Sequence, residues 1–485
     1  MSKFHSIVTR RDFMKALGLT GVGIGAAVAG APVLHDLDEL MSSTIAEVKR
    51  PWWIKQREHD NPTTEVDWSM LQRYDHKLVT PQKLATEAFG ADVVAQWDAE
   101  GRAKRDNQTY NVSGHMHRDV ALQAGAGGGP KVSAARGDWG GPMSTDTPEQ
   151  RGIPKWSGTP EEATRMMRAA MIFFGAAAIT VGGLNGKHRN FVNKSDRTRD
   201  IVFENLPAGD SGGLINNRYV IPDIPLWEIG WQSPHAREPY TTGQSQIWRS
   251  SNGARYTRRS IVQPATQEFL RALGYICIAG IGYPITSGSG NAIMHGGAEG
   301  ARATNCTISP VFGSTGTGYF ELITNLEMEE EPPIDAGTWK FCQTCGRCAD
   351  YCPSQSIPHT DVEPSYEIPR SRIAPNVPMT GHPWKKAFWP DRLTCNKYNR
   401  ESITASSFGC HICAQVCTFN QGQGAIAHDF AKGLVATTGI FNRFLFNMAE
   451  LFGYGNKDPE EWWNLSLPQF GIDTTVYARD GSYRK

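Results

Sequence analysis

Four cysteines between residues 342 and 352 constrain this chain more than any other feature of its sequence. They form an unbroken C-x2-C-x2-C-x3-C run, which Pro353 follows directly. Steps of three residues let three thiolates surround one face of an iron–sulfur cubane, while the fourth thiolate points toward a neighbouring cluster. The run therefore predicts an iron–sulfur site.

A second group of cysteines repeats this pattern with a longer first spacing. Fourteen residues separate Cys395 from Cys410, and Thr418 stands where the first run has its proline. The crossed pairing of ferredoxins that hold two 4Fe–4S clusters then gives two ligand sets. The first expected set is Cys342, Cys345, Cys348 and Cys417. The second expected set is Cys352, Cys395, Cys410 and Cys413.

Other uses of these cysteines explain the spacing less well. A disulfide scaffold suits an exported protein, but it does not require this close spacing. Zinc would give two tetrads without explaining four cysteines in eleven residues and the proline after them. The remaining two cysteines, Cys277 and Cys306, lie outside both groups, and we expect them to be buried apolar residues.

The N-terminus predicts export of the folded protein. Arg10 and Arg11 precede a weakly apolar run from Ala16 to Leu34, which is rich in glycine. Paired arginines before such a run are typical of a twin-arginine signal, expected here over residues 1–43. The alternative is an amphipathic surface helix. The twin-arginine translocase would carry a protein whose cofactors are already loaded, and the mature chain would lie on the outer face of the cytoplasmic membrane.

Composition excludes several classes of protein. The 485 residues include 49 basic and 49 acidic side chains, and 40% of all residues are apolar. This balance excludes a disordered polyelectrolyte and an integral membrane bundle. It also argues against a nucleic-acid partner bound through bulk positive charge. The sequence has no apolar span other than the weakly apolar N-terminal run. Membrane attachment would therefore need a partner protein.

The pattern of helix and strand signals predicts an α+β fold. Thr159 and Pro160 begin a helix that continues to Phe174, and a buried strand follows over residues 178–183. A second helix is expected over 260–273 and a second strand over 275–279. We divide the chain into a wrapping region of loops and short elements (44–158), a core (159–330), a cysteine module (331–430) and a tail that packs on the core (431–485).

Three glycine- and serine-rich stretches follow the second strand. They cover residues 287–291, 296–302 and 309–314 and are expected to form loops. Such loops let backbone amides approach a large flat or anionic ligand, so Ser309, Gly313 and Ser314 are candidate cofactor contacts. Ordinary connecting loops are the alternative. The chain has neither a dinucleotide-binding glycine motif nor a P-loop motif.

Taken together, these features resemble the corrinoid-dependent reductive dehalogenases. The resemblance extends over nearly the whole chain. It is carried by the twin-arginine segment, by the cysteine groups and by short segments at 51–53, 155–162, 269–275, 333–337, 452–455 and 461–463. It implies a nitroreductase-like core that binds a base-off, cobalamin-type cobalt corrinoid, and a C-terminal module like bacterial ferredoxin with two 4Fe–4S clusters. The absence of a D-x-H-x-x-G motif agrees with a corrinoid that takes no histidine ligand from the protein.

The resemblance also implies site residues. Tyr256 corresponds to the proton donor of the family, and Arg302, in its Gly-x-Glu-x-x-Arg element, corresponds to the basic partner that favours the phenolate. A pocket asparagine of some members corresponds here to Gly282, which leaves the organohalide substrate open. Without the resemblance, Tyr256 would be read as a residue at the start of a helix and Arg302 as a surface residue.

The implied reaction replaces a halogen of a small organohalide by hydrogen, with two electrons and one proton. The implied partners are an upstream electron donor of a respiratory chain and an integral membrane anchor protein. Two alternatives remain at this point. One is an exported electron-transfer subunit without a catalytic centre, and the other is an enzyme like epoxyqueuosine reductase.

Overall fold

The computed structural model describes the chain in thirteen segments. These are residues 53–77, 81–108, 111–127, 139–280, 284–303, 307–316, 318–379, 381–406, 409–420, 432–436, 442, 446–447 and 455–472. The expected export signal, Gly282 and Cys306 lie outside the described residues. No helix among the described residues is both long enough and apolar enough to cross a membrane.

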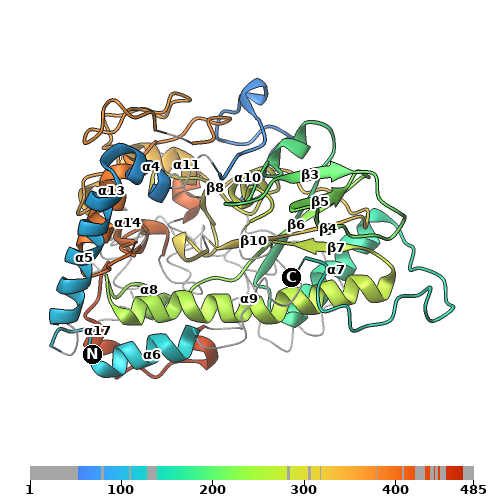
Figure 1. Ribbon diagram of the computed structural model, residues 1–485, viewed down its shortest axis with the longest axis horizontal. Helices are drawn as coiled ribbons and strands as arrows, with labels where there is room; N and C mark the ends of the chain where they lie inside the picture. The colour runs from blue at the N-terminus through green and yellow to red at the C-terminus, as the bar shows by residue number, and fades with distance from the viewer. Residues whose placement is uncertain are drawn as a thin grey trace, which may run out of the picture.

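A four-stranded antiparallel sheet forms the centre of the core. Its strands lie in the order β2–β6–β10–β7, with bounds Ala178–Gly183, Trp227–Gln232, Tyr319–Thr324 and Cys277–Ala279. Every neighbouring pair is antiparallel. All six residues of β2 are buried because helices cover both faces of the sheet (Figure 1). The chain is therefore a mixed α+β protein, as the sequence predicts.

Helices α7 (Pro160–Phe174) and α9 (Gln246–Leu273) cover one face of the sheet. Met171 of α7 and Leu270 of α9 pack there against Trp231 in one apolar cluster, and all three are fully buried. Helix α10 (Gly288–Met294) covers the opposite face. It approaches closely because β6 carries Gly230, where a Cβ atom would lie 2.0 Å from Oδ1 of Asn291.

The first half of the core agrees with the prediction in detail. Thr159 caps α7 and forms a capping box with Glu162, and Gly175 ends the helix in the left-handed conformation. The expected strand over 178–183 is β2. The expected strand over 275–279 is shorter and begins at Cys277, which is buried as predicted.

Two predictions for the second half are wrong. Helix α9 begins at Gln246 and has 28 residues, twice the expected length. Its first half was missed because polar side chains there face other parts of the protein, so no apolar period marks the helix. The expected loop over 287–291 is the start of α10, which Ser287 caps by accepting a hydrogen bond from the amide of Gly290.

The wrapping region is more helical than its composition indicates. It contains α4 (Pro81–Phe89), α5 (Ala91–Gln108) and α6 (His117–Gly127). Helix α4 has an apolar face, which buries Leu84 and Ala85. Strong helix formers such as alanine, arginine and glutamine produce α5 and α6 without a strong apolar period. Helix α5 packs on α13 (Arg392–Glu401) and α6 on α9, so this region does wrap the rest of the chain.

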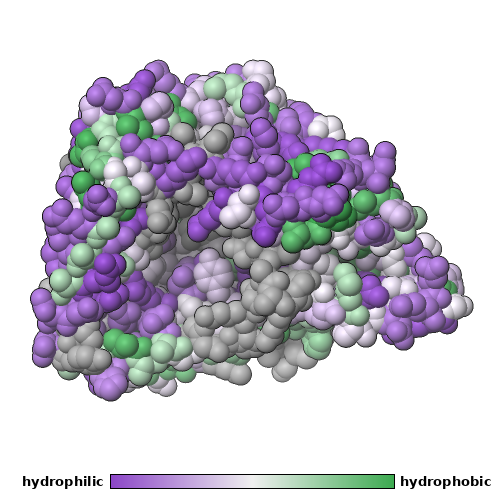
Figure 2. All heavy atoms as spheres, in the orientation of Figure 1, coloured by the Kyte–Doolittle hydropathy of each residue, from purple (hydrophilic) through white to green (hydrophobic). Residues whose placement is uncertain are grey.

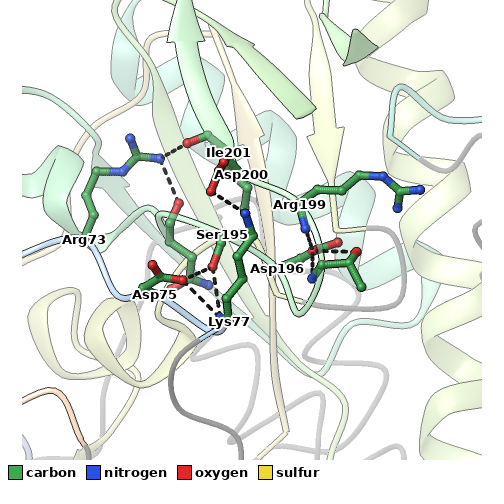
Figure 3. A network of polar contacts seen from close by, with 10 residues as sticks. Arg73, Asp75, Lys77, Ser195, Asp196, Arg199, Asp200 and Ile201 are labelled. Atoms are coloured by element: carbon green, nitrogen blue, oxygen red, sulfur yellow. Dashed lines mark hydrogen bonds and ion pairs between the residues drawn. The ribbon is translucent and has the colours of Figure 1, made fainter. Parts of the chain in front are cut away.

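A polar network fixes the extended segment before α4 to the core (Figure 3). Arg73 donates to the carbonyl of Ile201 at 2.7 Å, and Lys77 forms an ion pair with Asp200 at 2.7 Å. Ser195 donates to the carboxylate of Asp75 in the same place. The N-terminal part of the described chain is thereby held against the loop before β3.

The remaining elements are short. The other helices are α8 (Arg237–Tyr240), α11 (Thr338–Cys345), α12 (Arg347–Asp350), α14 (Ile412–Gln415) and α17 (Pro459–Trp462). The other strands are β1 (Lys55–Gln56), β3 (Ile201–Glu204), β4 (Gly213–Ile215), β5 (Arg218–Pro222), β8 (Glu299–Gly300), β9 (Thr307–Ile308) and β11 (Ile334–Asp335). The 3-10 turns are η1 (Trp68–Met70), η3 (Gly186–Phe191), η5 (Ser314–Gly316), η6 (Thr418–Asn420) and η7 (Gln469–Gly471).

Candidate functional site

The thiols of the first expected set face one small cavity between α11, α12 and η6. Its wall includes the four thiols of Cys342, Cys345, Cys348 and Cys417. Cys413 of the second expected set also reaches this wall. Among the described residues, no group of three or more His, Cys, Asp or Glu side chains converges to hold a single metal ion. The four thiols therefore line one cavity, and an iron–sulfur cluster there stays a prediction.

Burial controls the chemistry of these thiols. Burial and, to a smaller extent, the neighbouring Cys345 raise the pKa of Cys342 to about 12, although a hydrogen bond from Arg302 opposes this shift. Burial also raises the pKa of Cys348 well above its usual value, and Cys342, Cys345 and Cys417 each add to this shift. The four thiols are therefore close enough to oppose one another's ionisation. A bound metal must displace their protons, since thiolates are the metal ligands.

The second expected set is gathered around α13 and α14. Burial and the nearby thiols of Cys352 and Cys410 together raise the pKa of Cys395 to about 12. Cys413 packs against Cys352 in an apolar cluster. The structure thus brings the four thiols of the first set together, and it places Cys352 near Cys395, Cys410 and Cys413. Because Cys413 also lies on the wall of the first cavity, the division into two sets stays a prediction.

Hydrogen-bond donors surround the sulfurs of the second set. Cys352 Sγ accepts from the amide of Ser356 at 3.3 Å, and Cys395 Sγ accepts from Nδ2 of Asn399 at 3.5 Å. Cys410 Sγ accepts from Nε2 of Gln244 at 3.0 Å. Sequence reasoning missed these residues because no motif connects them with the cysteines.

Arg302 lies on the cysteine module and not beside Tyr256. Its guanidinium donates to the carbonyls of Cys342, Gln343, Pro358 and His359 at distances of 2.7–3.1 Å. It also lies 3.8 Å above the ring of Phe388, and the residue is only 1% exposed. None of the described contacts joins Arg302 to Tyr256. The structure therefore assigns Arg302 to the loop of the first cysteine set, where the sequence had predicted a partner of Tyr256.

The candidate cofactor contacts form a turn that connects the core with the second cysteine group. Ser309 and Gly313 exchange backbone hydrogen bonds. Gly313 adopts a φ of +63°, and a Cβ atom there would lie 2.3 Å from the carbonyl of Phe419. The hydroxyl of Ser314 donates to the carbonyl of Ala414 and contacts Asn420. The serine hydroxyls thus serve contacts within the protein, and a cofactor contact by this turn stays a prediction.

Tyr256 lies in the middle of α9 and is 47% exposed. Its ring packs edge-on against Phe320 of β10, with centroids 5.7 Å apart. The guanidinium of Arg255 lies 4.7 Å from the centroid of the Tyr256 ring. Burial lowers the pKa of Arg255, and a charge interaction and a hydrogen bond with the Tyr256 phenol oppose this shift. Arg255 is thus the basic residue beside Tyr256. The basic run around Tyr256 was the available signal for it.

The N-terminal part of α9 connects the tyrosine with the second cysteine set. Trp248 stacks on His411, which lies between Cys410 and Cys413, with ring centroids 4.9 Å apart. Arg249 donates to the carbonyl of Thr404 in the cysteine module. Tyr256 follows Trp248 by eight residues, which is about 12 Å along a helix axis.

The protein face drawn in Figure 2 is mostly hydrophilic and is hollowed near its centre.

Comparison with known proteins identifies the family. Residues 49–328 match the family model described as a reductive dehalogenase subunit, which is more than half of the chain. A chloroethene reductive dehalogenase of Dehalococcoides mccartyi strain VS is 30% identical, over 98% of this chain and 99% of its own. A trichloroethene reductive dehalogenase of Dehalococcoides mccartyi strain 195 is 26% identical, over 98% of this chain and all of its own.

A solved structure agrees with this result at the level of the fold. It is a reductive dehalogenase for which B12-dependent dehalogenation is described, with a TM-score of 0.54 and 16% identity. The alignment covers 93% of this chain, which spans about half (55%) of the solved chain. The present chain belongs to the reductive dehalogenase family. It is therefore an oxidoreductase, and the family and activity expected from the sequence are confirmed over the alternatives of an electron carrier and an epoxyqueuosine reductase.

Proposed function

We propose that the chain is a respiratory reductive dehalogenase that uses a cobalt corrinoid and two 4Fe–4S clusters. The overall reaction converts R–Cl, two electrons and one proton into R–H and chloride. The observation that carries this proposal is helix α9, which holds Tyr256 and also contacts the second cysteine set. Electron delivery and proton delivery are thereby arranged on one rigid element.

The cysteine module would deliver the electrons one at a time. We assign Cys342, Cys345, Cys348 and Cys417 to the first cluster, and Cys352, Cys395, Cys410 and Cys413 to the second. The shared cavity of the first set and the mutual influence of the thiols on their pKa values support this assignment. The second set lies beside the start of α9, so we propose that it passes the electrons toward the site of Tyr256.

Buried donors without protein acceptors support a large polar ligand near α9. Within the described residues, Nε of Arg255 and Nε1 of Trp248 are buried and have no hydrogen-bond partner. A buried unsatisfied donor costs roughly 1–3 kcal/mol. A corrinoid carries many amide oxygens that could accept these bonds, so the residues fit such a ligand. When bound, the corrinoid would supply a strong two-electron cobalt reductant.

Tyr256 would supply the proton to the substrate carbon. Its exposed phenol can reach a small molecule, and the guanidinium of Arg255 lies 4.7 Å from the centroid of its ring. Gly318 leaves room for this arginine, because a Cβ atom there would lie 1.8 Å from its Nη1. Arg302 would act indirectly, by holding the loop of the first cysteine set.

The finer architecture and the cellular setting are part of the proposal. We propose that the core over 159–330 is nitroreductase-like and that the module over 331–430 is ferredoxin-like. The antiparallel sheet with helices on both faces, and the crossed gathering of the cysteines, support these assignments. We further propose twin-arginine export, attachment through an integral membrane anchor protein, and a respiratory electron donor.

The test is analysis of the protein purified without oxygen after cofactor loading. We expect about one cobalt and about eight iron atoms per chain. Reduced viologen should then drive chloride release from a panel of chlorinated ethenes and chlorinated aromatics. The relatives above are named for chloroethene and trichloroethene, so the panel begins with these compounds. Protein that folds but binds no corrinoid would contradict the proposal.

A further inference from the structure

The side-chain amide of Gln244 connects the core directly with a cluster ligand. Its Nε2 lies 3.0 Å from Sγ of Cys410 and 2.9 Å from the hydroxyl of Tyr398. Gln244 precedes Ser245, the residue that caps α9. A glutamine amide has two N–H donors, so both contacts can be hydrogen bonds at the same time.

We propose that Gln244 raises the reduction potential of the second 4Fe–4S cluster through its N–H···S hydrogen bond to Cys410. Gln244 is a positioning residue, because it would act on the cluster through a cysteine ligand. The inference rests on the proposed function, since it requires that the second set holds a cluster. It adds a residue from outside both cysteine groups to the control of electron flow.

The direction of the effect follows from charge. Each added electron makes the cluster and its thiolates more negative, and hydrogen bonds to a negative acceptor are stronger than those to a neutral one. The bond from Gln244 therefore stabilises the reduced state more than the oxidised state. Hydrogen bonds to the sulfurs are among the known determinants of cluster potential.

Contacts with the cysteine module hold this amide in place. The hydroxyl of Tyr398 orients it, and Tyr398 lies on α13, the helix that also carries Cys395. The backbone next to Gln244 is also held, because the carbonyl of Gly243 accepts a hydrogen bond from Nε2 of Gln415 at 3.0 Å. A donor fixed in this way needs little rearrangement when the cluster is reduced.

Gln244 differs from the other side chains that contact these sulfurs in the region of the chain from which it comes. Asn399, which faces Cys395, and Ser354, which faces Cys352, both belong to the cysteine module. Gln244 belongs to the core, at the start of the helix that carries Tyr256. The potential of the second cluster would therefore depend on correct docking of the core on the module.

The test compares Gln244→Leu with Gln415→Leu in cluster-loaded protein. Both glutamines bridge the same interface, but Gln415 donates to a carbonyl and not to a sulfur. In an EPR-monitored redox titration at a fixed potential, Gln244→Leu should lower the ratio of reduced to oxidised second cluster about tenfold. This change equals a decrease of about 59 mV in the one-electron reduction potential. Gln415→Leu should leave this ratio unchanged. Signals of the second cluster are assigned by their loss in Cys352→Ala.

Two further measurements separate the outcomes. If Gln244→Leu does not retain the second cluster, Tyr398→Phe decides, because loss of the orienting hydroxyl should lower the potential in the same direction by a smaller amount. Both clusters present with an unchanged second potential would overturn the role of Gln244. Wild-type protein without iron would overturn the proposed function instead.

Discussion

The core and the cysteine module exclude water in different ways. In the core, apolar side chains of α7, α9 and the sheet form one large buried cluster. In the module, cysteines themselves are members of the apolar clusters, for example Cys342 beside Phe341 and Cys352 beside Ile357. The core can thus be stable through apolar burial alone, whereas the module has its ligand atoms at its centre.

This difference has a consequence for assembly. Burial keeps thiols such as Cys342 protonated in the metal-free protein, because it raises their pKa. In the proposed holoenzyme, cluster binding would release these protons and replace the thiols by iron–sulfur bonds, so that much of the module's stability would come from the cofactor. The comparison predicts that iron loss loosens the module and leaves the sheet folded.

Replacing one ligand of the second set should have the largest effect. In Cys352→Ala we expect iron to fall to about four atoms per chain, because only the first cluster retains all its ligands. Viologen-driven activity should be lost, since the second set contacts α9, the helix that carries Tyr256. Iron analysis and EPR measure the first effect, and chloride release measures the second.

The control is Cys277→Ala. Cys277 is also buried, but it lies in β7 on the apolar face of the core. The variant should lose some stability and no iron. Equal iron loss in both variants would mean that iron binding does not depend specifically on the cysteines of the module. Full iron content in Cys352→Ala would remove this residue from the ligand set.

The next largest effect concerns the link between the two regions. Tyr256→Phe removes only the phenol oxygen, and general acid catalysis typically contributes about 10²–10⁴-fold to a rate. We expect a loss of activity of this size with corrinoid, iron and reduction potentials unchanged. Tyr275→Phe is the control, because the Tyr275 hydroxyl donates to the carbonyl of Trp156 away from this site. Unchanged turnover in Tyr256→Phe would exclude Tyr256 as the proton donor.

The core should show a pH effect that comes from the buried carboxyl group of Glu228. Glu228 of β6 is buried, and burial raises its pKa to about 8, with a further increase from the nearby Glu321. Between pH 4.5 and 8 the folded state binds this proton and the unfolded state releases it. Stability of the core should therefore decrease as the pH rises through this window.

The matching variant is Glu228→Gln, which carries no titratable proton. Urea unfolding of the core between pH 5 and 8 should show a weaker decrease of stability with pH in this variant than in the wild type. The exposed Glu58→Gln serves as the control and should keep the wild-type slope. The same slope in Glu228→Gln and wild type would place the origin of the pH effect elsewhere.

How much the sequence could predict depends on how local the signal is. The cysteine run over 342–352 and α7 rest on short motifs, because steps of three cysteines and a capping box depend on neighbouring residues. The identity of the basic residue beside Tyr256 depends instead on contacts that form only in the folded chain. Sequence reasoning chose Arg302 from a motif, but the folded chain places its guanidinium on carbonyls of the module.

The first half of α9 shows why the rest was out of reach. Residues such as Arg255 and Trp248 are buried, but they face the site and the module instead of an apolar core. Their burial therefore leaves no apolar period in the sequence. Gln244 is a further example, since its contact with Cys410 joins residues 166 positions apart.

The smallest expected effect tests the local stability of the core. Thr159→Ala removes the hydroxyl that accepts from the amide of Glu162 at the start of α7. Loss of such a cap typically costs about 1 kcal/mol. Urea unfolding followed by tryptophan fluorescence should show this loss for the core, while the iron content stays at the wild-type value. Thr159→Ser keeps the hydroxyl and should restore most of the stability. If Thr159→Ala and wild type unfold alike, packing of Met167 and Met171 on the sheet is enough to fix the start of this helix.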